Sequence, residues 1–235
     1  MTSHERVVRD TTNHALRKPW ILSVGLAAVV VIVFIFNAAS APADVADQTP
    51  APSFEHLAMI PGFVDTGQVY RLWTAALLHS NLWSLIATVL TLLVVGTEVE
   101  KRWGARRYLV TLGTLALAAG VAVLYFEPAI SRFATGGGAA MGIMGAAFVV
   151  ARRARFRIWA LLLVAAFDII IYLTVADESS AWAAVGGFVG GAIIALLLIT
   201  APRDERRNRW QFIALGSFFV VLCLLVVLHM ALFAG

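Results

Sequence analysis

Long apolar segments alternate with short polar connections along almost the whole chain. Each segment is about 15 to 24 residues long, against the roughly 20 that a helix needs to cross a 30 Å hydrocarbon core. Backbone polar groups inside lipid must bond within their own segment, so helices are expected. The pattern predicts an all-α polytopic membrane protein with seven transmembrane helices, at about residues 20–40, 72–95, 108–126, 137–151, 158–175, 182–200 and 211–233.

Composition agrees with a membrane protein and argues against several other classes. Of the 235 residues, 60% are hydrophobic and 14% are charged, and the mean hydropathy is +0.85, which is unlike a soluble globular domain. The formal net charge of +4 does not indicate nucleic-acid binding, because the basic residues fall between the apolar segments. The single cysteine, Cys223, allows no internal disulfide and no cysteine-based metal cluster. We therefore expect no cofactor, no metal and no nucleic-acid partner.

The basic residues are concentrated on one side of the predicted topology. Sixteen of the 18 Lys and Arg residues lie in the N-terminal tail and in the second-to-third, fourth-to-fifth and sixth-to-seventh connections, whereas Arg71 and Arg132 lie on the other side. The positive-inside rule places the N-terminus in the cytoplasm and the C-terminus outside, in what we expect to be a bacterial plasma membrane. The chain then divides into a cytoplasmic tail over 1–19, a six-helix core over 20–200, and a basic cytoplasmic loop with a seventh transmembrane helix over 201–235.

Three motifs occur in order between residues 70 and 195. The first, around the second apolar segment, consists of Arg71, Leu78, His79, Gly96, Glu100 and Gly104. The second is GGGAAMGIMGA in the fourth segment, and the third is AAVGGFVGG in the sixth. The combination resembles the rhomboid family of intramembrane serine proteases. The resemblance implies a rhomboid-like six-helix core plus a seventh C-terminal transmembrane helix, with a catalytic serine on the fourth helix and a histidine on the sixth.

The resemblance also locates the family's catalytic positions, and none of them carries the family's side chain. The nucleophile's position falls on Gly137 and the base's position on Ala184, while Ser84 and Thr88 replace the histidine and asparagine that help hold the oxyanion. The chain contains no Gly-x-Ser-Gly and no histidine between residues 80 and 228. Because the serine mechanism needs a nucleophile with an adjacent base, we predict a catalytically inactive pseudoprotease.

Two further polar residues are candidates for a function of their own. Asp168 lies about eleven residues beyond the basic loop, hence about 16 Å deep at 1.5 Å per residue, where an acid is costly and suggests a functional role. It could instead be a structural acid, protonated or hydrogen-bonded, that faces Ser84, Thr88 or Tyr172 inside the bundle. His79 is expected to be a structural histidine at the outer interface, with a catalytic base as the alternative.

Small residues predict close helix packing, and one acid predicts a loop contact. The fourth and sixth segments carry glycines about one turn apart, which lets helices approach closely in lipid: Gly138, Gly142, Gly145, Gly187 and Gly191. The fourth segment is only about 22 Å long, so its start is expected below the membrane surface, at the bottom of a water-accessible cavity. Glu100 is expected to fasten the cytoplasmic loop through Arg106 and Arg107.

These observations together predict a scaffold, trafficking or stability function. We expect contacts with the lipid bilayer and with other membrane proteins or their transmembrane helices, and Asp168 and His79 are the candidate polar or client-contact residues. Two alternatives stay open. One is an intramembrane enzyme of unrecognised chemistry using Asp168, His79 or Ser84, and the other is a lipid or small-molecule binding or transport protein that uses the cavity near Asp168.

Overall fold

The computed structural model describes residues 20–40, 52–151, 158–174, 178–202 and 206–233. Within these ranges the regular structure is helical, which confirms the prediction of an all-α protein. The elements are α2 (Ile21–Ala39), α3 (Pro52–Leu57), α4 (Pro61–Asp65), α5 (Arg71–Thr74), η1 (Ala75–Leu77), α6 (Leu82–Leu90), η2 (Thr91–Gly96), α7 (Thr97–Trp103), α8 (Ala105–Phe126), α9 (Gly136–Ala151), α10 (Ile158–Thr174), α11 (Glu178–Thr200) and α12 (Arg207–Phe233).

The described helices include several of membrane-spanning length. Five are long and apolar enough to cross a membrane: Ile21–Ala39, Leu82–Trp103, Ala105–Phe126, Ala181–Thr200 and Arg207–Phe233. Two more are apolar but shorter, Gly136–Ala151 and Trp159–Ile171. Each predicted apolar segment thus contains a helix, in keeping with a multi-pass membrane protein, while the count of seven crossings stays a prediction.

The second apolar segment differs from the predicted helix over 72–95. Its first part forms the short elements α5 and η1, and the chain becomes extended before the long helix begins at Leu82. The Asn81 side chain caps this helix by accepting a hydrogen bond from the Ser84 amide at 2.8 Å, as N-cap residues do. The early part of the segment is apolar because it packs inside the protein, where Leu72 is buried. Hydropathy does not distinguish a protein core from lipid, so the pattern predicted one continuous helix.

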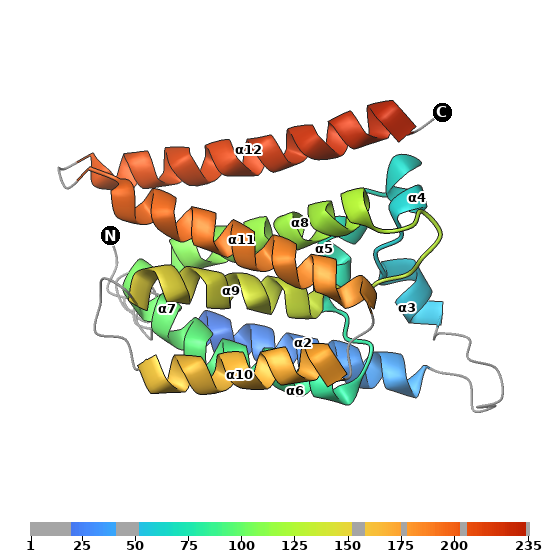
Figure 1. The fold of residues 1–235 in the computed structure, drawn as a ribbon, viewed down its shortest axis with the longest axis horizontal. Helices are drawn as coiled ribbons and strands as arrows, with labels where there is room; N and C mark the ends of the chain where they lie inside the picture. Colours follow the sequence, from blue (N-terminus) through green and yellow to red (C-terminus); the bar gives the residue numbers. More distant parts are fainter. Residues whose placement is uncertain (1–19, 41–51, 152–157, 175–177, 203–205, 234–235) are drawn as a thin grey trace, which may run out of the picture.

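The α9 helix lies in the middle of the bundle (Figure 1). α11 and α8 lie on one side of it with α12 covering them, and α6, α2 and α10 lie on the other side. α12 buries Leu222 and Val226 in an apolar cluster with side chains of α8. It is also tied to α4, because His229 Nδ1 lies 2.9 Å from Asp65 Oδ1. The C-terminal helix is therefore packed onto the core.

Glu100 is buried and fastens α7 to the start of α2. Its carboxylate accepts hydrogen bonds from the amides of Leu22 and Ser23 at 3.1 and 2.9 Å, and from Ser23 Oγ at 2.7 Å. The prediction that Glu100 fastens the loop through Arg106 and Arg107 is wrong about its partners. The first amides of a helix have no intrahelical acceptor, and a carboxylate satisfies them. Nothing in the local spacing could reveal a partner so far away along the chain.

Candidate functional site

The glycines of α9 and α11 face each other and bring the two backbones together. A methyl group on Gly187 would lie far inside contact distance of the Gly138 carbonyl oxygen, and one on Gly191 would clash in the same way with Gly142. A methyl group on Gly145, about one turn further along α9, would clash with the Phe188 carbonyl oxygen of α11. We call this contact the glycine seam. It lies where the sequence spacing predicted close packing, and it sets the position of α9 against α11.

The first turn of α9 is held by the chain segment that precedes α6. The Thr135 amide donates to the Ala75 carbonyl at 2.9 Å, and the Gly136 amide donates to the Leu78 carbonyl at 3.3 Å. The His79 ring packs so closely against Gly136 that a methyl group there would lie 2.6 Å from Cε1. The loop before α6 and the start of α9 therefore form one packed unit.

His79 is buried in this unit, away from solvent. Its two ring nitrogens make no hydrogen bond within the described part of the chain. Burial lowers the pKa of His79 to about 4, because the charged ring would lose its hydration, so the ring is neutral at neutral pH. A general base must reach the proton that it removes, and no described hydroxyl is hydrogen-bonded to this ring. The geometry favours a structural histidine.

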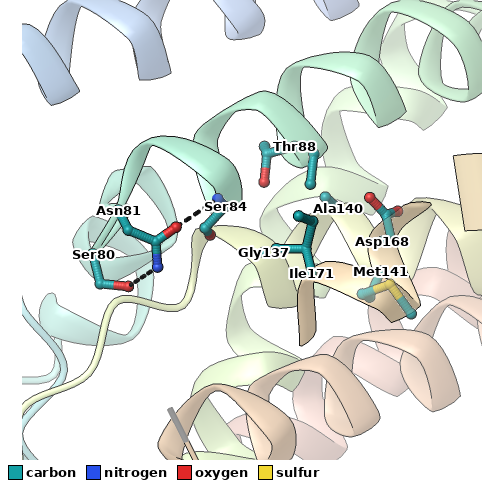
Figure 2. A pocket seen from close by; sticks show the side chains of 10 residues that line it. Ser80, Asn81, Ser84, Thr88, Gly137, Ala140, Met141, Asp168 and Ile171 are labelled. Atoms are coloured by element: carbon teal, nitrogen blue, oxygen red, sulfur yellow. Dashed lines mark hydrogen bonds between the residues drawn. The ribbon is translucent and has the colours of Figure 1, made fainter. Parts of the chain in front are cut away.

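A small pocket opens between α6, α9 and α10, beside the first turn of α9 (Figure 2). It has about 20 Å³ open to the centres of water molecules, which is room for a water or the tip of a side chain. Three positions that the resemblance assigns to the catalytic site, Gly137, Ser84 and Thr88, lie here with Asp168. The described residues that line it are Ser80, Asn81, Ser84, Ala87, Thr88, Gly137, Ala140, Met141, Asp168 and Ile171.

Ala184, the position that the resemblance assigns to the base, is buried on α11 and does not line this pocket. Its neighbour Ala183 has a carbonyl oxygen 2.6 Å from the place of a methyl group on Gly138. One turn later, Gly187 touches the Gly138 carbonyl. Ala184 and Gly137 are thus each one residue from a pair in direct contact, and the two positions lie at the same level of the bundle.

Asp168 is the one titratable side chain among the described residues that line the pocket. Thr91 Oγ donates a hydrogen bond to Asp168 Oδ2 at 2.8 Å, while Ser84 and Thr88, which Asp168 was expected to face, line the same pocket. The third residue that it was expected to face, Tyr172, has a side chain outside the described part of the structure. Asp168 Oδ1 and Thr88 Oγ are both buried, and neither has a partner in the described part of the chain. A buried polar atom left in this way costs about 1–3 kcal/mol.

The polar groups nearer the mouth of the pocket bond to one another. Asn81 Oδ1 accepts from the Ser84 amide at 2.8 Å, and Asn81 Nδ2 donates to Ser80 Oγ at 3.3 Å (Figure 2). Figure 2 places Thr88 and Asp168 apart from this group, further along the pocket. The amide group of Asn81 is therefore hydrogen-bonded, whereas Thr88 Oγ and Asp168 Oδ1 remain without partners in the described part of the chain.

Thr91 is the site residue that the sequence interpretation missed. It begins η2, a π-helical turn over Thr91–Gly96, and such turns are frequent at functional sites. A signal was present, because Thr88 and Thr91 are three residues apart and such residues share a helix face. The pairing with Asp168 was not visible, since the two residues are 77 positions apart in the sequence.

A family model for the Rhomboid domain matches residues 66–201. The chain belongs to the rhomboid family. The match includes every helix that builds the pocket and the glycine seam, and it leaves α2 and α12 outside. No curated protein matches the sequence. The rhomboid family is known for intramembrane serine proteases.

Proposed function

We propose that this rhomboid-family protein lacks serine protease activity and binds other membrane proteins, using the pocket beside α9 to hold a polar group of a partner's transmembrane helix. One observation carries the proposal. The nucleophile's position is Gly137, and the pocket around it offers hydroxyls, an amide and the carboxyl group of Asp168. A role in trafficking, in stability or in assembly of a complex would use such a contact.

The missing nucleophile and base support inactivity. No Gly-x-Ser-Gly occurs in the chain, and no histidine lies between residues 80 and 228. Ala184 stands at the base's position and cannot accept a proton. In a serine protease the loss of the nucleophile or the base alone costs on the order of 10⁶ in kcat. The slow rate that remains would come from binding and from oxyanion donors.

The unpartnered atoms of the pocket support a binding role. Asp168 Oδ1 and Thr88 Oγ are buried together in the pocket lining, and Thr91 orients the carboxyl group through the other oxygen. A hydrogen-bond donor on a partner helix, such as an amide, hydroxyl or ammonium group, would satisfy them. Hydrogen bonds between helices in lipid contribute about 0.6 kcal/mol on average and up to about 1.7, enough to favour one partner over another.

The two alternative functions fit this pocket less well. A lipid or drug-sized ligand needs a cavity of roughly 300–1,000 Å³, far more than this one provides. An enzyme using Ser84 needs a base within hydrogen-bond reach. Among the described residues, His79 does not line the pocket, and no hydrogen bond joins the Ser84 hydroxyl to Asp168, whose described partner is Thr91.

We also propose the topology. The chain crosses a bacterial plasma membrane seven times, with the N-terminus in the cytoplasm and the C-terminus outside. In support, the basic α7–α8 turn and the basic start of α12 lie at the same end of the bundle (Figure 1), as the positive-inside rule requires. A phosphatase reporter that works only outside the cytoplasm, fused after residue 235, should be active, and an inactive fusion would contradict this orientation.

Photo-crosslinking in native membranes tests the binding role. A photoreactive amino acid replaces Met141 in the pocket, and in a matched control it replaces Leu163, which is 71% exposed on α10. We expect membrane proteins to crosslink at position 141 and not at 163. The variant Asp168→Asn keeps an acceptor for Thr91 and should weaken the crosslinks at 141. Recovery of lipid alone at both positions would contradict the proposal.

Labelling with a fluorophosphonate, which reacts with activated serines, tests inactivity separately. We expect the folded protein to react no more than a heat-denatured sample. Labelling of a serine in the folded protein alone would show an active nucleophile and would overturn the inactive assignment.

A further inference from the structure

A second and larger cleft lies at the end of the bundle opposite α3 and α4, where α7, α8, α11 and α12 meet (Figure 1). It has about 280 Å³ open to water centres. Three arginines line it, Arg102, Arg107 and Arg207, and none of the described residues that line it is acidic. The cleft joins the matched rhomboid domain to α12 and is independent of the pocket beside α9.

Arg107 is positioned in this cleft by neutral groups. Its Nη1 donates to the Trp103 carbonyl at 2.9 Å, and its Nη2 donates to Asn208 Oδ1. The guanidinium lies 5.9 Å from the centre of the Phe212 ring. Its Nε is buried without a partner in the described part of the chain. These groups orient the guanidinium without neutralising its charge.

The other two arginines add further positive charge. Arg102 is paired with Glu98 at 3.0 Å, on a partly exposed surface. Arg207 is the first residue of α12 and is exposed, and it makes no hydrogen bond or ion pair with a described residue. The start of a long helix itself carries a partial positive charge, from amides that lack intrahelical acceptors.

The walls of the cleft are fixed by a buried contact. Gln211 Nε2 donates to the Leu198 carbonyl at 2.9 Å, which ties α12 to α11 beside the arginines. The shape of the cleft is therefore set by the packing of α11 against α12, and not only by exposed side chains.

We propose that this cleft binds a phosphate oxyanion. A guanidinium presents its donors in a planar fork that matches phosphate oxygens, and the α12 amides favour the same charge. Helices α11 and α12 are long apolar helices that end and begin here, so the cleft lies at the level of the lipid headgroups, where basic pockets between helices bind anionic lipids. An anionic lipid is the expected source, and free phosphate presents the same oxyanion.

The test titrates the purified full-length protein, in neutral detergent at fixed ionic strength, with phosphatidylglycerol, phosphatidylcholine or inorganic phosphate. The unfolding temperature reports binding, because a ligand that binds only the folded state raises it. Arg207→Gln removes a charge that lines the cleft and makes no contact that folding needs. Arg209→Gln removes an equally exposed charge from the same helical turn, outside the cleft lining.

We expect phosphatidylglycerol to stabilise the protein more than phosphatidylcholine does. We also expect Arg207→Gln to weaken its apparent affinity about fivefold, as one charge near a lipid surface contributes about 1 kcal/mol, while Arg209→Gln changes it less than about twofold. The same dependence on Arg207 seen with inorganic phosphate, and not with lipid, would support the oxyanion site with free phosphate as its source. Equal losses in the two variants, or no loss in either, would overturn the proposal.

Discussion

Toward α11 the α9 helix presents glycines that leave no room for a methyl group, whereas toward α6 and α10 it presents Gly137, Ala140 and Met141 to a pocket. The first face is held by direct backbone contact along the glycine seam. The second borders the pocket, where the hydrogen bond between Thr91 and Asp168 joins η2 to α10 and involves no residue of α9. The two faces therefore differ in what stabilises them and in how much space they leave.

This difference separates the packing of the fold from the chemistry of the pocket. Close packing of the seam needs only small residues and van der Waals contact, so it does not depend on a serine or a histidine. The pocket face, in contrast, keeps buried polar atoms that lower stability. Such groups inside a membrane are costly and are functional sites by default.

The largest expected effect is on the seam. Gly191→Ala places a methyl group against the Gly142 carbonyl, and because two packed backbones must separate we expect a loss of about 3 kcal/mol in the free energy of unfolding. Gly216→Ala on α12 is the matched control, since nothing lies within 4 Å of an added methyl group there. It should be neutral or stabilising by up to about 1 kcal/mol. Unfolding in mixed micelles measures both, and equal effects would remove the distinction between the faces.

The next effect is a pH dependence at the first turn of α9, from which both faces extend. His79 packs against Gly136 with its pKa lowered to about 4, while an unfolded histidine titrates near 6.5. The unfolded chain therefore binds the proton first, and stability is lost as the pH falls below about 6.5, by about 2 kcal/mol at pH 5. His79→Gln should remove this part of the dependence. An unchanged slope of unfolding free energy against pH in the variant would show that other groups cause it.

On the pocket face, the contact between Thr91 and Asp168 should have a smaller effect. Thr91→Val removes the donor and leaves the carboxyl group without a partner in the described part, so we expect a loss of about 1 kcal/mol. Thr88→Val removes a buried hydroxyl that has no partner there and should be neutral or slightly stabilising. The same unfolding assay compares them. A larger loss from Thr88→Val would indicate that its hydroxyl is satisfied within the protein.

The smallest effect should come from adding a side chain on the pocket side. Gly137→Ser is expected to change the free energy of unfolding by less than about 0.5 kcal/mol, because the position lines a pocket and serine is a better helix former than glycine. Gly138→Ser, one residue away, places its Cβ 2.6 Å from the Ala183 carbonyl oxygen. We expect it to lower the free energy of unfolding by about 2 kcal/mol. Similar losses at both positions would show that the pocket face is as closely packed as the seam.

Much of the fold could be predicted from local patterns. Apolar length identified the membrane helices, and glycine spacing identified the two helices of the seam. The interpretation was wrong where an apolar run packs inside the protein, as in α5 and η1. It was also wrong about Glu100, whose partners Leu22 and Ser23 belong to a distant helix. Contacts between helices depend on how each one rotates and inclines, which periodicity does not specify.

The sequence by itself determined that this is a multi-pass rhomboid-family protein, and that Gly137 and Ala184 stand where the resemblance places the nucleophile and the base. Identity of side chains and spacing within a helix are local properties, so they can be derived without coordinates. Only the tertiary structure decided that Ser84, Thr88 and Asp168 share one pocket, that Thr91 holds the acid, and that three arginines meet at the opposite end. Each of these depends on the packing of helices far apart in the chain.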